Sequence, residues 1–584
     1  ADSGIDTNHC FFSDANGVPI SQYRSNPTAA DFPAGQESQR KIVQYVAFAD
    51  AADDEDGHGT HVAGIAAGSA EIDGMYSKFN GMAPESKLAF FDIGMANGDL
   101  NLPDDLTSMF QWSYVAGARI HSNSWGTEAP QYTSLSRDMD QYMYAHDDFL
   151  ILVAAGNDGA CGQQTTIGSP ATAKNIITVG SCMTDIDSYN TLGITPPLFS
   201  SFPTTMFDAN NIATFSSRGP TSDSRIKPDI VAPGFAAMSA KVAPRGSPSN
   251  VCGQPDINVL TVKSGTSMST PAAAGALALI REYFIEGFYP TGRRNQSHSM
   301  TPSGSLMKAI AVAGGKHLTG TRLVTDQFTV ATQQQKCPNI QFASIDQFPG
   351  VDQGWGRLQL DQVLEFRETS SSPFYLYLLG GTHPSIANSQ SHTYSMCVMP
   401  SPLSTAPTRI VLVWTDPPGQ PQSAIQLVND LDLIVEYNRS DQIHLGNEGA
   451  YDGVATADRR NPIETILINA PTMSDGPIDM KIIVNAAAIN IGQEQRYSLV
   501  VTGLARPYNC QEAASNEDDK GFLTPLIATS PSNDGNRSGF ASASVFKGVI
   551  IAAAVIGTCI ICLVVGAVVL KIRYSTVIRA RGIN

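Results

Sequence analysis

Ser264-Gly265-Thr266-Ser267-Met268-Ser269-Thr270-Pro271 is the stretch from which we interpret the rest of the chain, and it leads into a run of small and apolar residues that ends at Ile280. The run predicts a helix with Pro271 in its first turn, where a missing N–H costs nothing. Ser267 then lies where the helix begins, beside unpaired N–H groups and the positive end of the helix dipole, which favours a developing oxyanion. Taken alone, however, the stretch is more typical of a Ser- and Thr-rich loop that caps a buried helix.

Three other short segments contain the groups that a nucleophilic serine needs. They are Asp2-Ser3-Gly4-Ile5-Asp6, His58-Gly59-Thr60-His61-Val62-Ala63-Gly64 and Ala154-Ala155-Gly156-Asn157-Asp158-Gly159. A serine nucleophile requires a base to take its proton, an acid to orient that base, and a donor for the oxyanion. A carboxylate, an imidazole and an amide, each at the end of a predicted element, match those needs.

The order Asp, His, Asn, Ser resembles that of the subtilisin-like serine proteases, and the four local motifs are similar to those of that family. The resemblance implies that Ser267 attacks a peptide carbonyl and that His58 carries protons. Asp2 would orient His58, and Asn157 would hold the oxyanion. His61, one turn after His58, is assigned to packing. The resemblance implies protein or peptide substrates and no cofactor for catalysis. The alternative from another class is a catalytically silent surface adhesin or receptor that retains the fold.

Short apolar runs without polar alternation recur between residues 88 and 180. They include Leu88–Phe91, Phe149–Val153 and Ile176–Val179. Such runs are typical of strands buried on both faces, and therefore of a parallel sheet covered by helices. Residues 40–48 predict a further strand from their β-branched and aromatic content. The predicted fold class is α/β, with a subtilisin-like parallel sheet flanked by helices.

The similarity to the family extends to about residue 368, so we expect a peptidase domain at residues 1–368. In that family the catalytic Asp follows a buried strand, an N-terminal segment and a removable propeptide, whereas Asp2 is the second residue here. We therefore expect this domain to be N-terminally truncated in the sequence, with a propeptide upstream.

A substrate pocket is implied by the resemblance at two further places. Ser124, Trp125 and Gly126 resemble the segment that flanks the substrate, and Gly156 and Gly168 resemble the opposite wall and the base. Glycine at those places predicts a roomy slot, and hence a preference for a large apolar P1 residue, the residue before the scissile bond. Asp158 on the rim is the one acid expected to help a basic P1 residue.

An acidic loop precedes the histidine motif and contains Asp50, Asp53, Asp54, Glu55 and Asp56. A solvated loop and a cation site are equally good interpretations of this cluster.

Strands and turns alternate from residue 373 to residue 505, which predicts a β-sandwich or jelly-roll domain. The segments Leu427–Leu433 and Asn461–Ile466 resemble the C-terminal jelly roll of certain alkaline subtilases. That resemblance implies structural calcium, with Asp430 and Asp432 as metal ligands. Turn-forming residues without an ion are an equally good interpretation.

The C-terminal residues divide into three further segments. Residues 506–547 are rich in Ser, Asn, Pro and Asp and predict a flexible stalk. Residues 548–570 are almost wholly apolar and uncharged, and are long enough to cross a bilayer as one helix. The basic residues that follow predict a cytoplasmic tail at residues 571–584, which would make the chain a single-pass membrane protein with its catalytic domain extracellular or lumenal.

Composition excludes some classes of partner. The chain of 584 residues has a formal net charge of −17, and no large basic region is present to bind nucleic acid. Nine cysteines and three N-glycosylation sequons, at Asn295, Asn438 and Asn536, fit a secretory route and a glycoprotein.

Overall fold

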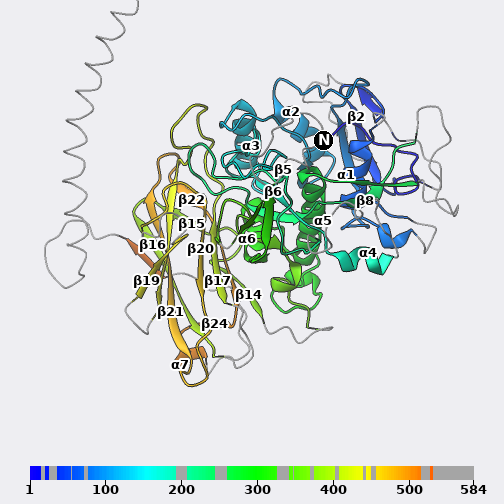
Figure 1. The fold of residues 1–584 in the computed structure, drawn as a ribbon. Coiled ribbons are helices and arrows are strands. Elements are labelled where there is room, and N and C mark those ends of the chain that lie inside the picture. The colour runs from blue at the N-terminus through cyan, green and yellow to red at the C-terminus, as the bar shows by residue number, and fades with distance from the viewer. Residues whose placement is uncertain are drawn as a thin grey trace, which may run out of the picture. The chain divides into compact units, whose positions relative to one another are not determined.

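The computed structural model describes residues 1–14, 20, 22–24, 36–53, 56–70, 76–192, 207–243, 259–324, 341–345, 347–367, 374–400, 407–437, 442–448, 456–513 and 526–529. Residues 1–529 form one compact unit (Figure 1).

A six-stranded sheet is the centre of the N-terminal part. Its strand order is β10 (Gly315–Lys316), β13 (Arg357–Leu358), β7 (Ile230–Pro233), β6 (Ile177–Cys182), β5 (Leu150–Ala154) and β4 (Ile120–Asn123). All neighbours are parallel except β10 and β13. Every residue of β5 and β6 is buried, which agrees with the predicted parallel sheet with both faces covered.

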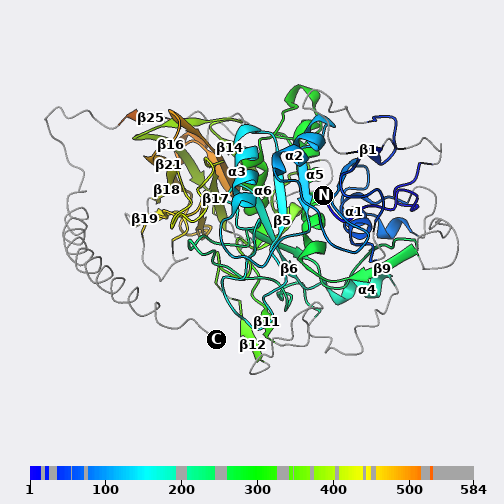
Figure 2. The same cartoon turned by 90° about the horizontal axis from the view of Figure 1, so that it is seen from above.

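A second, three-stranded parallel sheet consists of β1 (Gln22–Arg24), β2 (Ile42–Ala47) and β3 (Leu88–Asp92). The N-terminus lies between this sheet and the larger one. Asp2 forms a parallel bridge with Asp92 beside β3, and the Ala1 amino group donates to the carbonyl of Ser122 in β4 at 3.0 Å. In both views the N-terminus lies between α1 (His58–Ala67) and β5 (Figures 1 and 2).

Helices cover these sheets. The longest is α5 (Thr266–Ile285), which packs against β4 to β7 and against α1. The others in this part are α2 (Leu106–Val115), α3 (Ser134–Ala145), α4 (Ile186–Leu192), α6 (Gly304–Ala313), η1 (Ser77–Phe79), η5 (Gln296–His298) and η6 (Leu360–Gln362). Two short antiparallel pairs complete it: β8 (Ala237–Ala240) with β9 (Leu260–Lys263), and β11 (Thr321–Val324) with β12 (Gln341–Ser344).

Pro271 lies one turn further into α5 than the sequence suggests. The helix begins at Thr266, so Pro271 is its sixth residue. A proline there cannot donate to the carbonyl of Ser267, four residues earlier. The Ser124 hydroxyl donates to that carbonyl instead, at 2.8 Å. Pro271 therefore leaves open an acceptor that ties α5 to the residue after β4.

The C-terminal part is a sandwich of two antiparallel sheets. One has the order β14 (Tyr375–Leu379), β23 (Ser498–Gly503), β17 (Thr408–Val413), β20 (Ile463–Ile468). The other has the order β19 (Gln442–Leu445), β18 (Asp430–Tyr437), β21 (Ile478–Ala488), β16 (Gln390–Val398), β24 (Ala505–Pro507), and β25 (Leu526–Thr529) also pairs with β16. A separate pair joins β15 (Ser385–Ala387) to β22 (Glu494–Arg496).

The four-stranded sheet is apolar on both faces. In β14, Tyr377 and Leu379 belong to the core between the two sheets. The alternate residues Leu376 and Leu378 belong to the core of the N-terminal part. That core includes α6, which packs against β17 and β23, and α6 lies beside β17 in both views (Figures 1 and 2). Because side chains alternate along a strand, this sheet serves two cores at once.

Part of the predicted stalk belongs to the sandwich. Residues 505–513 contain β24 and α7 (Cys510–Ala513), and Cys510 forms a disulfide with Cys397 of β16. The prediction was wrong there because a disulfide and a short edge strand leave little trace in composition. Within the described residues, no helix combines the length and the apolar character needed to cross a membrane. The predicted span at 548–570 and the tail at 571–584 lie outside those residues.

Candidate active site

Asp2 and His58 form a hydrogen-bonded ion pair. Nδ1 of His58 lies 2.7 Å from Oδ1 of Asp2, and the Asp2 side chain is 5% exposed while that of His58 is 29% exposed. Burial raises the pKa of Asp2, but the charge of His58 and the hydrogen bonds from His58 and Ser3 outweigh it, so the pKa lies below its ordinary value. Burial likewise lowers the pKa of His58, yet the charge and hydrogen bond of Asp2 hold it above its ordinary value. The pair therefore stabilises a protonated imidazole.

The start of α1 is held against the N-terminal segment by Asp53. The Asp53 carboxylate accepts from the backbone N–H of Thr60 and from the hydroxyl of Ser3, each at 2.8 Å. The Ser3 hydroxyl in turn accepts from the N–H of Gly59 at 2.9 Å. This network fixes His58 relative to Asp2, because Ser3 and Gly59 are the chain neighbours of the two partners.

Asp53 and Ser3 are site residues that the sequence did not single out. Asp53 was grouped with a loop expected to be solvated or to bind a cation, but it is only 4% exposed and acts as an acceptor for α1. Burial raises its pKa to about 6. The sequence feature that could have indicated this role is the position of Asp53, five residues before His58. The close approach also explains Gly59, since a Cβ there would lie 2.0 Å from the carbonyl oxygen of Gly4.

His61 is a packing residue, as expected. It is fully buried, and its Nε2 lies 3.2 Å from the carbonyl of Thr261. Burial lowers its pKa to about 3, so the imidazole is neutral at ordinary pH.

Asn157 and Ser267 meet at the start of α5. Oδ1 of Asn157 accepts from the N–H and the hydroxyl of Thr266, at 2.9 and 3.0 Å. With its oxygen held by these donors, the amide leaves its nitrogen as a donor, and this nitrogen and the backbone nitrogen of Ser267 would each lie 3.6 Å from a Cβ built on Gly265. Ser267 is the second residue of α5, where backbone N–H groups have no helical acceptor. Two donors therefore converge at this place, as an oxyanion site requires.

The Ser267 hydroxyl donates to the carbonyl of Ser124 at 3.1 Å. Among the described residues it makes no hydrogen bond to His58. Catalytic hydrogen bonds of this kind are often formed only when substrate is bound. The geometry places the acid and base in contact, and the donor amide beside the start of α5.

The predicted pocket residues lie around the same point. Ser124 contacts Ser267 directly, while Trp125 is buried and Gly126 is exposed. Two of the glycines also have a packing or backbone reason, and the roomy slot stays a prediction. A Cβ on Gly168 would lie 1.8 Å from the carbonyl oxygen of Thr127, and one on Gly156 would lie 2.8 Å from the Ser217 hydroxyl oxygen. At Gly168 the backbone of Thr127 approaches so closely that only glycine fits, and at Gly156 the backbone φ of 106° favours glycine.

A second acid lies near the rim of this pocket. Burial and the nearby charge of Glu128 raise the pKa of Asp158. Glu128 is also close to Gly168, since a Cβ built there would lie 3.6 Å from the Cα of Glu128. The rim is therefore more acidic than the sequence alone suggested.

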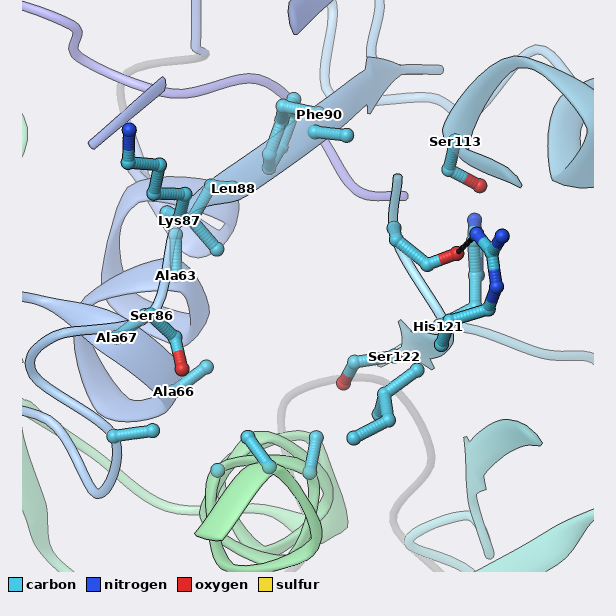
Figure 3. Close-up of a pocket in the computed structure, with 18 of the residues that line it drawn as sticks. Ala63, Ala66, Ala67, Ser86, Lys87, Leu88, Phe90, Ser113, His121 and Ser122 are labelled. Carbon is cyan, nitrogen blue, oxygen red and sulfur yellow. Dashed lines mark hydrogen bonds between the residues drawn. The ribbon is translucent and has the colours of Figure 1, made fainter. Parts of the chain in front are cut away.

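A cavity of about 500 Å³ lies beside Asp2 (Figure 3). One wall is formed by α1 and β3, with Ala63, Leu88 and Phe90, and the facing wall by β4, with His121 and Ser122. Residues of α5 line a third side. The cavity separates β3 from β4 next to the Asp2 bridge.

Asp430 and Asp432, the predicted metal ligands, are both bound by an arginine. Nη1 of Arg459 lies 2.7 Å from Oδ2 of Asp430 and also contacts Oδ1 of Asp432. A guanidinium therefore lies where an ion shared by the two carboxylates would bind, and calcium would have to displace Arg459 to bind there. Within the described residues, no group of three or more His, Cys, Asp or Glu side chains could hold a metal ion.

Comparison with known proteins finds a protease family and individual proteases to which this chain is similar. The model of the Subtilase family, Peptidase_S8, matches residues 1–308. The chain is 33% identical over 595 residues to the Serine protease/ABC transporter B family protein tagD of Dictyostelium discoideum, covering 86% of this chain and 31% of that protein. It is 32% identical over 249 residues to Serine protease AprX of Bacillus subtilis, covering 39% of this chain and 49% of AprX. Among solved structures it is similar to Sphericase, with 20% identity, a TM-score of 0.34, and coverage of 59% of this chain and 95% of that chain.

The family model and the serine protease relatives indicate the class of serine-type endopeptidases, and Asp2, His58, Asn157 and Ser267 stay its predicted site residues. Because the family model matches more than half of its residues, the chain belongs to the subtilase family. Subtilases need no cofactor for catalysis, and they act on proteins or peptides. The chain spans about a third of the length of the Dictyostelium relative.

Proposed function

We propose that this chain hydrolyses peptide bonds in proteins through an acyl-enzyme on Ser267. The observation that carries the proposal is the Asp2–His58 pair, which stabilises a protonated imidazole. A silent adhesin would have no need for a base whose protonated form is stabilised in this way.

The proposed reaction has two halves. Oγ of Ser267 attacks the peptide carbonyl carbon while its proton passes to Nε2 of His58, and the oxyanion accepts from the Asn157 amide and the Ser267 N–H. The C–N bond then breaks, and His58 gives its proton to the leaving amine. A water molecule next loses a proton to His58 and attacks the ester carbon. His58 returns that proton to Ser267, which releases the acid. Asp2 keeps its charge throughout and holds Nδ1 of His58.

Hydrolysis of an unfolded protein substrate tests this function. The full chain is expected to cleave it, and a Ser267→Ala variant with the same melting curve is expected not to. An adhesin that retains the fold would give two equally inactive proteins.

For specificity, we propose a broad enzyme with a preference for large apolar P1 residues. The rim carboxylates Asp158 and Glu128 favour tolerance of Lys and Arg as well. A panel of peptides that differ only at P1 tests both statements. Exclusive cleavage after small residues would contradict them.

We propose that residues 548–570 anchor the chain as a single span, with the catalytic part outside or in a lumen and residues 571–584 in the cytoplasm. Two observations favour a secretory route. Cys397 and Cys510 are joined in a disulfide, and Asn295 of the first sequon is exposed. The name of the Dictyostelium relative joins a serine protease to an ABC transporter. The proposal of one membrane span concerns residues 1–584 and not the rest of a longer protein.

Protease added outside intact cells tests the topology. A short fragment that begins near Gly548 should remain protected. Protection of the whole catalytic part would place it in an internal compartment, and cleavage of the tail would contradict the proposal.

Propeptides are typical of subtilases, and we propose that upstream residues, including such a segment, assist this chain too. The cavity beside Asp2 supports a strand there. Asp2 is in register with Asp92, so residues preceding Ala1 would run parallel to β3 and line up with Phe90 and Leu88. A chain extended by an apolar segment before Ala1 should melt at a higher temperature than the chain as given. Equal melting temperatures would contradict this.

A further inference from the structure

A buried ion pair joins the sandwich to the residues just before β6. Nζ of Lys174 contacts Oδ2 of Asp416, and both side chains are 0% exposed. The same ammonium donates to the carbonyls of Pro417 at 2.7 Å and Gln426 at 2.8 Å. A lysine has three N–H donors, and all three acceptors come from the loop after β17. The ammonium therefore depends entirely on the sandwich.

The neighbouring residue repeats this connection. Asn175 donates from its amide nitrogen to the carbonyl of Asp416 and accepts from its N–H, both at 2.9 Å. The Asp416 carboxylate also accepts from the N–H groups of Val428 at 2.9 Å and Asn429 at 2.7 Å. Residues 174–175 and the loop after β17 thus form one hydrogen-bonded unit.

This unit continues into the predicted wall of the substrate pocket through α3. The Asp140 carboxylate of α3 accepts from the backbone N–H of Lys174 at 3.0 Å and of Asn175 at 2.8 Å. It also accepts from the hydroxyl of Tyr132 at 2.8 Å. The Tyr132 oxygen accepts in turn from the N–H of Gly419 in the sandwich loop at 3.2 Å.

A chain of hydroxyl groups leads from there to the pocket glycines. The Ser136 hydroxyl lies 2.9 Å from that of Thr172 and 3.2 Å from that of Ser169. The carbonyl of Ser169 accepts from the N–H of Thr127 at 2.8 Å. Ser169 and Thr127 directly follow Gly168 and Gly126, the two pocket residues. Ser136, Ser169 and Thr172 are all fully buried, so a shift at one end has little room to relax.

We propose that the Lys174–Asp416 pair is a positioning device through which the sandwich holds the pocket wall at residues 168–175 and so sets selectivity for the P1 side chain. This inference rests on the proposed peptidase function. Removing one or both partners deletes the contact that ties the wall to the sandwich loop, so the wall is no longer held in one position. The reacting groups near Ser267 do not touch the pair, so the chemistry on a small reagent should be unaffected.

The experiment compares Asp416→Asn with a matched control, Asp147→Asn. Asp147 also joins the two parts, through Arg496 at 3.5 Å and His383 at 3.2 Å, but its side chain is 31% exposed. A small fluorophosphonate counts the competent sites in each protein. The ratio of kcat/KM for a Phe P1 substrate to that for an Ala P1 substrate is then measured per titrated site.

In Asp416→Asn we expect this ratio to move toward one by roughly 10-fold, mainly through KM, with an unchanged labelling rate. In Asp147→Asn the ratio should equal that of the wild type. The apolar variant Lys174→Met/Asp416→Leu, which leaves no buried charge, should show the same loss of selectivity and serves if Asp416→Asn does not fold.

An unchanged ratio in Asp416→Asn or in the double variant, or an equal change in Asp147→Asn, would overturn the inference. Failure of the wild type to react with the fluorophosphonate would instead refute the proposed function.

Discussion

The Asp2–His58 and Lys174–Asp416 pairs are both buried contacts between residues far apart in the chain, yet they are built differently. The His58 side chain is 29% exposed and only one of its ring nitrogens is bound to Asp2. Lys174 is completely enclosed, and each of its three donors has an acceptor. The first pair is partly open to solvent, while the second is closed on all sides. The comparison shows how one chain uses the same type of interaction for chemistry in one region and for fixed geometry in another.

Removing the imidazole should have the largest effect. His58→Ala is expected to lower kcat by about 10⁶-fold, the loss known for a triad of this kind, without a large change in the melting temperature. Stopped assays of peptide hydrolysis, with circular dichroism as the folding control, measure both. A large loss of stability would show that the Asp2–His58 pair also has the fixed structural role that we assign to the other pair.

Breaking the Lys174–Asp416 pair should instead reduce stability. Lys174→Met leaves Asp416 buried without its partner, and breaking such a pair costs about 3–5 kcal/mol of unfolding free energy. The double variant Lys174→Met/Asp416→Leu should recover most of that loss, because it leaves no buried charge. Denaturant unfolding of both variants checks this. A single variant as stable as the wild type would contradict the fixed role.

Removing the neutral amide of Asn157 should reduce kcat less than removing His58 does. Asn157→Ala is expected to lower kcat by about 10²–10³-fold, because the amide acts on the oxyanion of the transition state. KM should change little. Asn157→Asp keeps the size of the side chain and should be at least as damaging, since a carboxylate repels the oxyanion. A variant with normal kcat would exclude Asn157 from the oxyanion site.

The activity that depends on the Asp2–His58 pair should change with pH. Hydrolysis needs neutral His58, so kcat/KM should fall as the pH decreases through a pKa above the ordinary 6.5. Asp2→Asn removes the charge that raises this pKa, and the acid limb should move to lower pH. An unmoved limb in Asp2→Asn would show that another group sets it.

The same pair contributes to stability in a defined pH window. Because the His58 pKa is raised on folding, its contribution is complete below 6.5 and is lost as the pH rises through the folded-state value. The Asp2 pKa is lowered, so its contribution is present above 3.8 and is lost as the pH falls through the folded-state value.

The smallest effect is expected at Asp430 and Asp432. Arg459 is 50% exposed there, and exposed pairs are worth about 0.2–1 kcal/mol. The change in melting temperature between calcium and a chelator should be the same for the wild type and for Asp432→Asn. A calcium effect that disappears in Asp432→Asn would mean that the ion displaces Arg459.

The sequence was sufficient to place a residue where a short motif lies at the end of a helix or strand with a strong local pattern. His58 begins α1, and Asn157 follows β5 just after Ala154, because buried strands and small-residue helices have strong local patterns. Pro271 was misplaced by a turn, because the sequence pattern does not show that α5 already begins at Thr266. The role of Asp53 was missed because acids in a loop look alike until one of them is buried.

The contacts between the sandwich and the N-terminal part could not be predicted from the sequence either. Lys174 and Asp416 are 242 residues apart, and nothing in the pattern around either residue indicates that it is buried. The strand β14 reads as apolar at every position, which predicts burial but not that its two faces serve different cores. Such features arise only when two separately patterned regions pack together.

Mapping the adduct of a fluorophosphonate on the full chain tests the central claim most directly. Mass spectrometry of the labelled protein is predicted to find the phosphonyl group on Ser267, and labelling should be lost in His58→Ala at the same pH. An adduct on another residue, no adduct on folded wild type, or equal labelling of His58→Ala would contradict the account.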